Sequence, residues 1–236
     1  MSHRPNGQPP AARGLAAPNR RTMHCNPARR CALGLTALGL AWLTSGCSTV
    51  WPDPPRGILR IVSVSEWGGQ VVAPASPPQT LHRLTVHHQG EVWRAGGDVP
   101  AYLRRLQKWS QEARGWADIP YHFIVAPDGA VYAARPVSMA GDTNTDYDPS
   151  GHLLVMLLGN FEVQTPTAAQ WQSTVEVMAQ GIARHGLQRA AIGTHRQHAT
   201  QTVCPGANLE ARFDALREEA ITRSRQLKVS ALRKPP

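Results

Sequence analysis

Two histidines and one cysteine, close together near the C-terminal end, give this chain its candidate chemistry. They are His195, His198 and Cys204, in the stretch THRQHATQTVCPG. A cysteine in such a setting can be half of a disulfide, a nucleophile with a histidine as its base, or a metal ligand. The rest of the sequence helps to decide among these three roles.

Histidines also stand at or near the ends of predicted strands elsewhere, as the adjacent pair His87 and His88 and as His122. Zinc binds neutral imidazole and thiolate, and a catalytic zinc site has three protein ligands and a fourth position open to water. Adjacent strand residues point to opposite faces, so at most one of His87 and His88 is expected to be a ligand. A histidine taken alone is more often a surface or core residue. Together with Cys204, these histidines make Zn²⁺ binding a hypothesis.

The N-terminal segment resembles a secretion signal. Arg29 and Arg30 precede an apolar run, CALGLTALGLAWL, at residues 31–43. The run is too short to span a bilayer and is typical of the core of a signal peptide. The next residues, LTSGC, end at Cys47 and resemble a bacterial lipobox, in which the cysteine is lipidated and becomes the new N-terminus.

Lipidation of Cys47 is therefore expected. The serine that follows it favours, by resemblance to enterobacterial lipoproteins, the periplasmic face of the outer membrane. Ordinary signal cleavage, which would give a soluble periplasmic protein, is the alternative. Cleavage before Cys47 leaves two of the four cysteines, and lipidation then leaves Cys204 without a disulfide partner. An unpaired thiol in an oxidising compartment points to a metal or to catalysis.

The basic character of the chain is concentrated in the same N-terminal segment. The formal net charge is +9, but residues 1–46 contain six arginines and no acidic residue. The remainder carries only a small positive excess. We therefore expect no nucleic-acid partner.

The segments that must position the candidate residues alternate between strand and helix patterns. The strand patterns are 81–89, 121–136, 152–161 and 191–194, the second of them a hairpin about Asp128-Gly129 and the third a central strand. The helix patterns begin after Asp98 as a cap, after Thr165-Pro166, and after Asn208 as a cap. Their predicted inward faces are Tyr102, Leu106, Trp109 and Ala113; Trp171, Val175, Met178 and Ile182; and Leu209, Phe213, Leu216 and Ala220. The predicted fold class is α/β, a single domain with a central mixed β-sheet flanked by about three helices.

Four segments are expected along the chain. They are an N-terminal extension and signal peptide at 1–46, a lipidated proline-rich linker at 47–57, the folded domain at 58–224, and a basic tail at 225–236. A proline-rich linker would hold the domain a short distance from a membrane. We expect the domain to be a monomer.

Five segments, in the same order, resemble the zinc-dependent N-acetylmuramoyl-L-alanine amidases, a family that includes phage lysozyme-type amidases and animal peptidoglycan recognition proteins. The segments are SEWGG at 65–69, TVHHQG at 85–90, GWADIPYHFIVAPDGAVYAARP at 115–136, LLGNFE at 157–162 and THRQHATQTVCPG at 194–206. The resemblance covers about residues 65–215.

The resemblance implies a peptidoglycan amidase that cuts the bond between N-acetylmuramic acid and L-alanine of the stem peptide. Its partners would be peptidoglycan or muropeptides, and its cofactor Zn²⁺. By position, the implied zinc ligands are His87, His195 and Cys204. Tyr121 falls on the family's catalytic tyrosine, and Thr202 falls where members carry lysine or threonine. The remaining histidines of these segments have no ligand role in this mapping.

The sequence departs from the family pattern at two places. A related branch has a glutamate in the central strand, where this chain has Met156. The family often has Gly-x-His before that strand, where this chain has AGDTNTDYD at 140–148. The first departure removes the glutamate from the expected mechanism and leaves Tyr121 in it.

Alternative functions stay open at this point. One is a non-catalytic peptidoglycan-binding module of the same fold, against which the presence of Cys204 argues. A second is a thiol hydrolase with Cys204 as nucleophile and His195 or His198 as base. A third is a lipoprotein without enzymatic activity.

Overall fold

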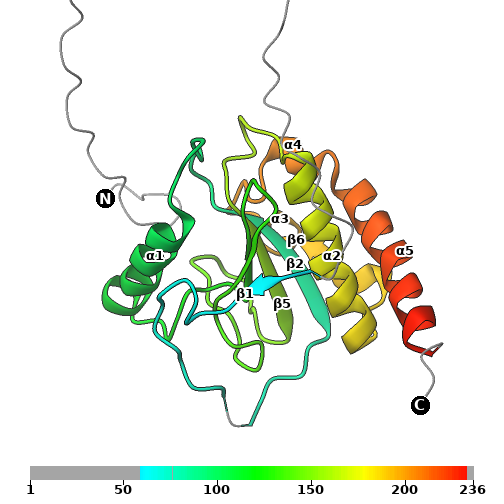
Figure 1. Cartoon of the computed structure of the whole chain (residues 1–236), viewed down its shortest axis with the longest axis horizontal. Helices are drawn as coiled ribbons and strands as arrows, with labels where there is room; N and C mark the ends of the chain where they lie inside the picture. The colour runs from blue at the N-terminus through cyan, green and yellow to red at the C-terminus, as the bar shows by residue number, and fades with distance from the viewer. Residues whose placement is uncertain (1–58, 76, 233–236) are drawn as a thin grey trace, which may run out of the picture. The chain divides into compact units, whose positions relative to one another are not determined.

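A six-stranded sheet lies at the centre of the domain (Figure 1). The structure is a computed structural model, and it describes residues 59–75 and 77–232. The strands are β1 Ile61–Val62, β2 Arg83–His88, β3 Phe123–Val125, β4 Val131–Ala133, β5 His152–Leu157 and β6 Ile192–Thr194. Their order across the sheet is β1-β4-β3-β5-β2-β6. The β3–β4 pair is antiparallel and the other pairs are parallel, so the sheet is mixed, as predicted.

Three long helices cover the two faces of this sheet. They are α1 Val99–Arg114, α2 Ala168–His185 and α5 Phe213–Leu232, with the shorter α3 His195–His198, α4 Ala207–Glu210 and the 3-10 turn Arg189–Ala191 between the last two. Figure 1 shows α1 on one side of the sheet and α2 and α5 on the other. Apolar side chains of α1 pack with Ile124 and Met156, whereas those of α2 and α5 pack with Val86 and Val155. Strand β5 is covered on both faces and is buried throughout, which confirms the central strand.

Helix α1 begins where the sequence predicted. The Asp98 side chain accepts a hydrogen bond of 2.9 Å from the backbone N–H of Ala101, which satisfies one free donor of the first turn. The predicted inward face is wrong at its last residue, because Ala113 is exposed, whereas Trp109 is partly buried against the core. The buried face instead consists of Val99, Tyr102, Leu103, Leu106, Gln107 and Ser110.

Helix α2 begins two residues later than Pro166, because the Thr167 side chain caps it by accepting from the N–H of Gln170 at 3.0 Å. Its predicted inward residues are buried or, for Val175, partly buried against the core.

The predicted cap of the last helix is wrong. Asn208 lies inside α4, and its side-chain amide donates to the carbonyl of Gln164 at 2.9 Å. Helix α5 starts only at Phe213, although the predicted inward residues Leu209, Phe213, Leu216 and Ala220 are all buried. The helix also runs on to Leu232, through most of the segment that we assigned to a basic tail.

The leader segment falls outside this description. The predicted signal peptide, Cys47 and the proline-rich linker all precede residue 59. In the part of the chain that the structure describes, no helix combines the length and hydropathy needed to cross a membrane.

Candidate metal centre

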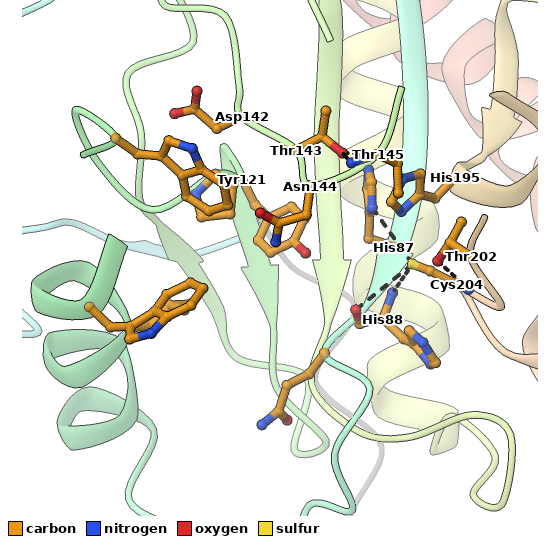
Figure 2. Close-up of a pocket in the computed structure, with 15 residues that line it drawn as sticks. His87, His88, Tyr121, Asp142, Thr143, Asn144, Thr145, His195, Thr202 and Cys204 are labelled. Atoms are coloured by element: carbon orange, nitrogen blue, oxygen red, sulfur yellow. Dashed lines mark hydrogen bonds between the residues drawn. The ribbon is translucent and has the colours of Figure 1, made fainter. Parts of the chain in front are cut away.

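Three side chains that were predicted as zinc ligands come together at one end of the sheet. His87 is near the end of β2, His195 begins α3, and Cys204 lies in the loop before α4. Their candidate ligand atoms all lie within 4.8 Å of one another. Figure 2 shows the three side chains pointing toward one another.

The sheet register explains why residues so far apart in the chain meet. Strands β2 and β6 are parallel neighbours with Val86 opposite Thr194, so the next residues, His87 and His195, leave the same edge of the sheet. Cys204 is brought back to this edge by a hydrogen bond of 2.9 Å from the N–H of Arg196 to its carbonyl. The backbone N–H of His88 then donates to the Cys204 Sγ at 3.3 Å.

Burial sets the charge state of these three groups in the protein without metal. It lowers the pKa of His195 to about 4 and lowers that of His87 well below its ordinary value, with the neighbouring His195 adding to the effect. Both imidazoles are therefore neutral at pH 7, the form that binds a metal. Burial also raises the pKa of the Cys204 thiol to about 12, despite the hydrogen bond from the His88 N–H.

The three residues fit zinc. Two imidazole nitrogens and one sulfur are a donor set that zinc takes in catalytic sites. Tetrahedral nitrogen and sulfur ligands at the usual zinc distances are about 3.5 Å apart. His87 Nδ1 and Cys204 Sγ are 3.6 Å apart. The spacing of this pair therefore already matches one edge of a zinc tetrahedron.

The cluster opens into a pocket, and Figure 2 shows the side chains around it. The residues that line it are His87, His88, Gln89, Leu106, Trp109, Trp116, Pro120, Tyr121, Asp142, Thr143, Asn144, Thr145, His195, Thr202 and Cys204. Trp109 and Trp116 pack edge to face with ring centroids 5.9 Å apart. The pocket is thus lined both by aromatic rings and by the candidate metal ligands.

Tyr121 and Thr202, the two predicted catalytic residues, both line the pocket. The Tyr121 ring is 5.0 Å from the His87 ring, centroid to centroid. We expected Tyr121 to be the first residue of a strand. The structure instead begins β3 at Phe123, two residues later. Burial raises the pKa of Tyr121 well above its ordinary value, with Cys204 as the next cause, so its hydroxyl keeps its proton at neutral pH.

The Thr202 hydroxyl has a structural contact as well as a place in the pocket. It accepts a hydrogen bond of 3.0 Å from the backbone N–H of Cys204. It therefore holds the loop that carries the candidate sulfur ligand.

The other histidines of the predicted segments lie outside the cluster. His88 Nδ1 accepts from the N–H of Phe161 at 3.2 Å. His122 Nδ1 accepts from the N–H of Leu154 at 2.9 Å, and its Nε2 lies 2.9 Å from the carbonyl of Met139. These contacts are structural.

The central strand β5 places no polar side chain at the position of Met156, whereas the loop before it places two hydroxyls next to the candidate ligands. Met156 pairs with His87 across β5 and β2 and is fully buried, so no carboxylate stands at that position. The sequence did not indicate two hydroxyls of the preceding loop that contact the candidate ligands. Thr145 Oγ1 is 2.8 Å from His195 Nε2, and the Tyr147 hydroxyl is 3.5 Å from His87 Nε2. No local pattern could reveal contacts between residues so distant in the chain.

Comparisons with family models and with individual proteins indicate the same family. The family described as N-acetylmuramoyl-L-alanine amidase matches residues 77–207, more than half of the chain. The chain is 29% identical over 153 residues to peptidoglycan-recognition protein SC2 of Drosophila simulans, covering 64% of this chain and 83% of that protein. It is 34% identical over 119 residues to N-acetylmuramoyl-L-alanine amidase of Homo sapiens, covering 50% of this chain and 20% of that protein.

Solved structures show the same fold. Drosophila PGRP-LB is similar with a TM-score of 0.57 and 25% identity, over 66% of this chain and 93% of that one. The amidase LysC from Clostridium intestinale is similar with a TM-score of 0.55 and 21% identity, over 68% and 96%. A variant of PGRP-LB was solved in complex with tracheal cytotoxin.

Proposed function

We propose that this chain, which belongs to the N-acetylmuramoyl-L-alanine amidase family, is a zinc-dependent enzyme that cuts peptidoglycan. The bond cut is the amide between N-acetylmuramic acid and L-alanine of the stem peptide. The observation that carries the proposal is the convergence of His87, His195 and Cys204 beside a pocket. Relatives include proteins named as amidases and proteins named as recognition proteins, so the ligand set is what favours catalysis over binding alone.

The residues of the chain divide the work of the reaction. His87, His195 and Cys204 would hold Zn²⁺. When bound, zinc lowers the pKa of a water molecule and polarises the scissile carbonyl. The protonated hydroxyl of Tyr121 can donate to the oxygen on which negative charge develops, an interaction worth about 3–4 kcal/mol in well-studied hydrolases. The leaving nitrogen must be protonated as the amide breaks, and the attacking water loses a proton. Tyr121 can relay it by giving its own proton to the nitrogen and taking up the one from the water.

Mass spectrometry of the products tests the reaction. The full-length protein is incubated with purified peptidoglycan and, separately, with 1,6-anhydro-muropeptides. We expect free stem peptides that begin with L-alanine, loss of activity after chelation, and recovery when Zn²⁺ is added. Elemental analysis should find one zinc per chain. Binding of muropeptides without any release of peptide would instead support the non-catalytic module, and failure to take up zinc would contradict the metal assignment.

We also propose that Cys47 carries a lipid that attaches the protein to the periplasmic face of the outer membrane. The support is the LTSGC sequence after the apolar run, which lies outside the described residues. Anchored there, the domain would be in the compartment that contains peptidoglycan.

A further inference from the structure

We propose that Thr145 and Tyr147 are positioning residues that fix both ligand histidines in the orientation that presents Nδ1 to the metal. Both residues belong to the loop of residues 140–148 before β5, which we call the strap. The inference rests on the proposed function, because it assumes that the cluster holds zinc. It concerns how this chain orients its ligands, which the family assignment does not specify.

The contacts of His87 separate its two ring nitrogens. Nδ1 faces the Cys204 Sγ at 3.6 Å, a separation that suits two ligands of one zinc. Nε2 faces the hydroxyl of Tyr147 at 3.5 Å. A histidine that binds a metal through one nitrogen carries its proton on the other. His87 would therefore bind through Nδ1 and donate its Nε2 proton to Tyr147.

The contacts of His195 lead to the same assignment. Its Nε2 lies 2.8 Å from Thr145 Oγ1, the shorter of the two contacts with the strap. Thr145 Oγ1 in turn lies 2.8 Å from Thr143 Oγ1, so the Thr145 hydroxyl can accept from His195 and donate to Thr143. Nε2 is then engaged by the protein, and Nδ1 is the nitrogen left for the metal.

The start of the strap is tied to β4 and β5 by contacts of Arg135 and Gly141. The Arg135 side chain, only 3% exposed, donates to the carbonyl of Ala140 at 2.6 Å and pairs with Asp142. Gly141 passes so close to the core that an added Cβ would lie 2.2 Å from the Leu154 side chain.

The far end of the strap is held by aromatic contacts. The Tyr147 ring stacks on His198 with centroids 5.6 Å apart and an interplanar angle of 24°. It also lies 5.5 Å from the ring of His152. Tyr147 is not among the residues that line the pocket, so it can orient His87 from outside that lining.

Zinc affinity measures the effect directly. The full-length protein and its variants are titrated with Zn²⁺ against a chromogenic chelator. Loss of a group that orients a ligand typically weakens metal binding by about 10- to 100-fold. Thr145→Val keeps the shape and removes the hydroxyl, and we expect binding about tenfold weaker. Thr145→Ser restores the hydroxyl and should bind as the wild type does. Tyr147→Phe keeps the stacked ring, and we expect a smaller loss, about threefold, because its contact is longer.

Matched controls separate orientation from general damage. Thr174→Val removes a buried hydroxyl that donates to the carbonyl of Gln170 in α2 and does not line the pocket, and it should leave zinc affinity unchanged. Substitution with Co²⁺ supplies a spectroscopic readout. An imidazole that has lost its hydrogen bond to the strap can reorient, which changes the geometry around Co²⁺ and shifts its visible absorption bands. We expect the shift in Thr145→Val and not in Thr145→Ser or Thr174→Val. Unfolding of the metal-free proteins checks that each variant folds.

Two results would overturn the inference while leaving the proposed function intact. One is wild-type affinity and wild-type Co²⁺ bands in both Thr145→Val and Tyr147→Phe. The other is a Thr145→Ser variant as impaired as Thr145→Val, which would mean that the hydroxyl is not what matters. A wild-type protein that binds no zinc would overturn the proposed function, and the inference with it.

Discussion

At the scale of single residues, the hydroxyl of Tyr121 is the group whose role can be tested apart from metal binding. Tyr121→Phe should bind zinc as the wild type does, because the hydroxyl is not among the candidate ligand atoms. Its kcat should fall by roughly 10²–10³ if the hydroxyl donates to the developing oxyanion. Steady-state kinetics and zinc analysis check both parts. Tyr132→Phe, on β4 and absent from the pocket lining, is the control and should keep its kcat.

Cys204 separates the metal enzyme from a thiol hydrolase. Cys204→Asp keeps an anionic zinc ligand, since carboxylate oxygen also binds zinc. We expect this variant to retain zinc and partial activity, whereas Cys204→Ala should lose both. A zinc-loaded aspartate variant without any activity, together with a wild type that survives exhaustive chelation, would identify Cys204 as a nucleophile. The buried thiol, with its pKa raised to about 12, argues against that outcome.

The sequence could suggest the candidate ligands but not their neighbours. His87, His195 and Cys204 were proposed from short motifs, which can be recognised from neighbouring residues alone. The contacts of Thr145 and Tyr147 depend on where the strap lies after folding, and the stretch AGDTNTDYD carries no periodicity that fixes its path. Such contacts are tertiary properties that a pattern of neighbouring residues does not encode.

At the scale of elements, Arg135 joins the end of β4 to two loops around the site. Its guanidinium donates to the carbonyls of Asp118, Ile119 and Ala140 at 2.6–2.8 Å. Arg135→Lys keeps the charge but cannot reproduce this planar set of donors. We expect the free energy of unfolding to fall by about 2 kcal/mol, measured by urea denaturation. Arg60→Lys, at an exposed ion pair with Glu66, should change it by less than about 1 kcal/mol. Equal effects in the two variants would contradict the role given to Arg135.

The elements themselves were predicted well where periodicity and caps agree. Helix α1 combines Asp98 as a cap with an apolar face, and β5 is apolar on both faces. The errors lie where a tertiary contact overrides local preference. Asn208 is a good capping residue, yet its side-chain amide donates to the carbonyl of Gln164 instead of capping a helix. A separate short helix, α4, precedes α5. Strand β1, at Ile61–Val62, has only two residues and is defined by its pairing with β4. A segment this short has no periodicity from which a strand could be predicted.

At the scale of the whole molecule, buried neutral histidine makes the fold sensitive to acid. Burial lowers the pKa of His122 to about 4, from an ordinary value of 6.5. As pH falls from 6.5 toward 4, the unfolded chain takes up a proton at this position that the folded chain refuses. Stability therefore falls in this window, by up to about 1.4 kcal/mol per pH unit.

Urea denaturation of the metal-free protein at pH 7 and pH 5 measures this loss. We expect His122→Asn to be less stable at pH 7, because it loses buried hydrogen bonds, and to show a weaker dependence on pH than the wild type. A variant with an unchanged pH dependence would show that other groups are responsible.

The anchor is also a property of the whole molecule. If Cys47 is lipidated, Cys47→Ala should move the protein from the membrane to the soluble periplasmic fraction, as followed by fractionation and immunoblotting. Cys25→Ala, which precedes the apolar run, is the matched control and should stay with the membrane. A Cys47→Ala protein that remains with the outer membrane would contradict the lipobox interpretation.

The parallel pairing of β2 with β6 has a consequence for the order of events during synthesis. His87 and Cys204 are 117 residues apart in the chain, and β5 and β6, which flank β2 in the sheet, are made between them. A ribosome that has made β2, α1 and the hairpin has made one ligand and no site. A zinc ion held as we propose would therefore have no complete ligand set until the chain has been made as far as Cys204. A product truncated anywhere before Cys204 lacks the third candidate ligand.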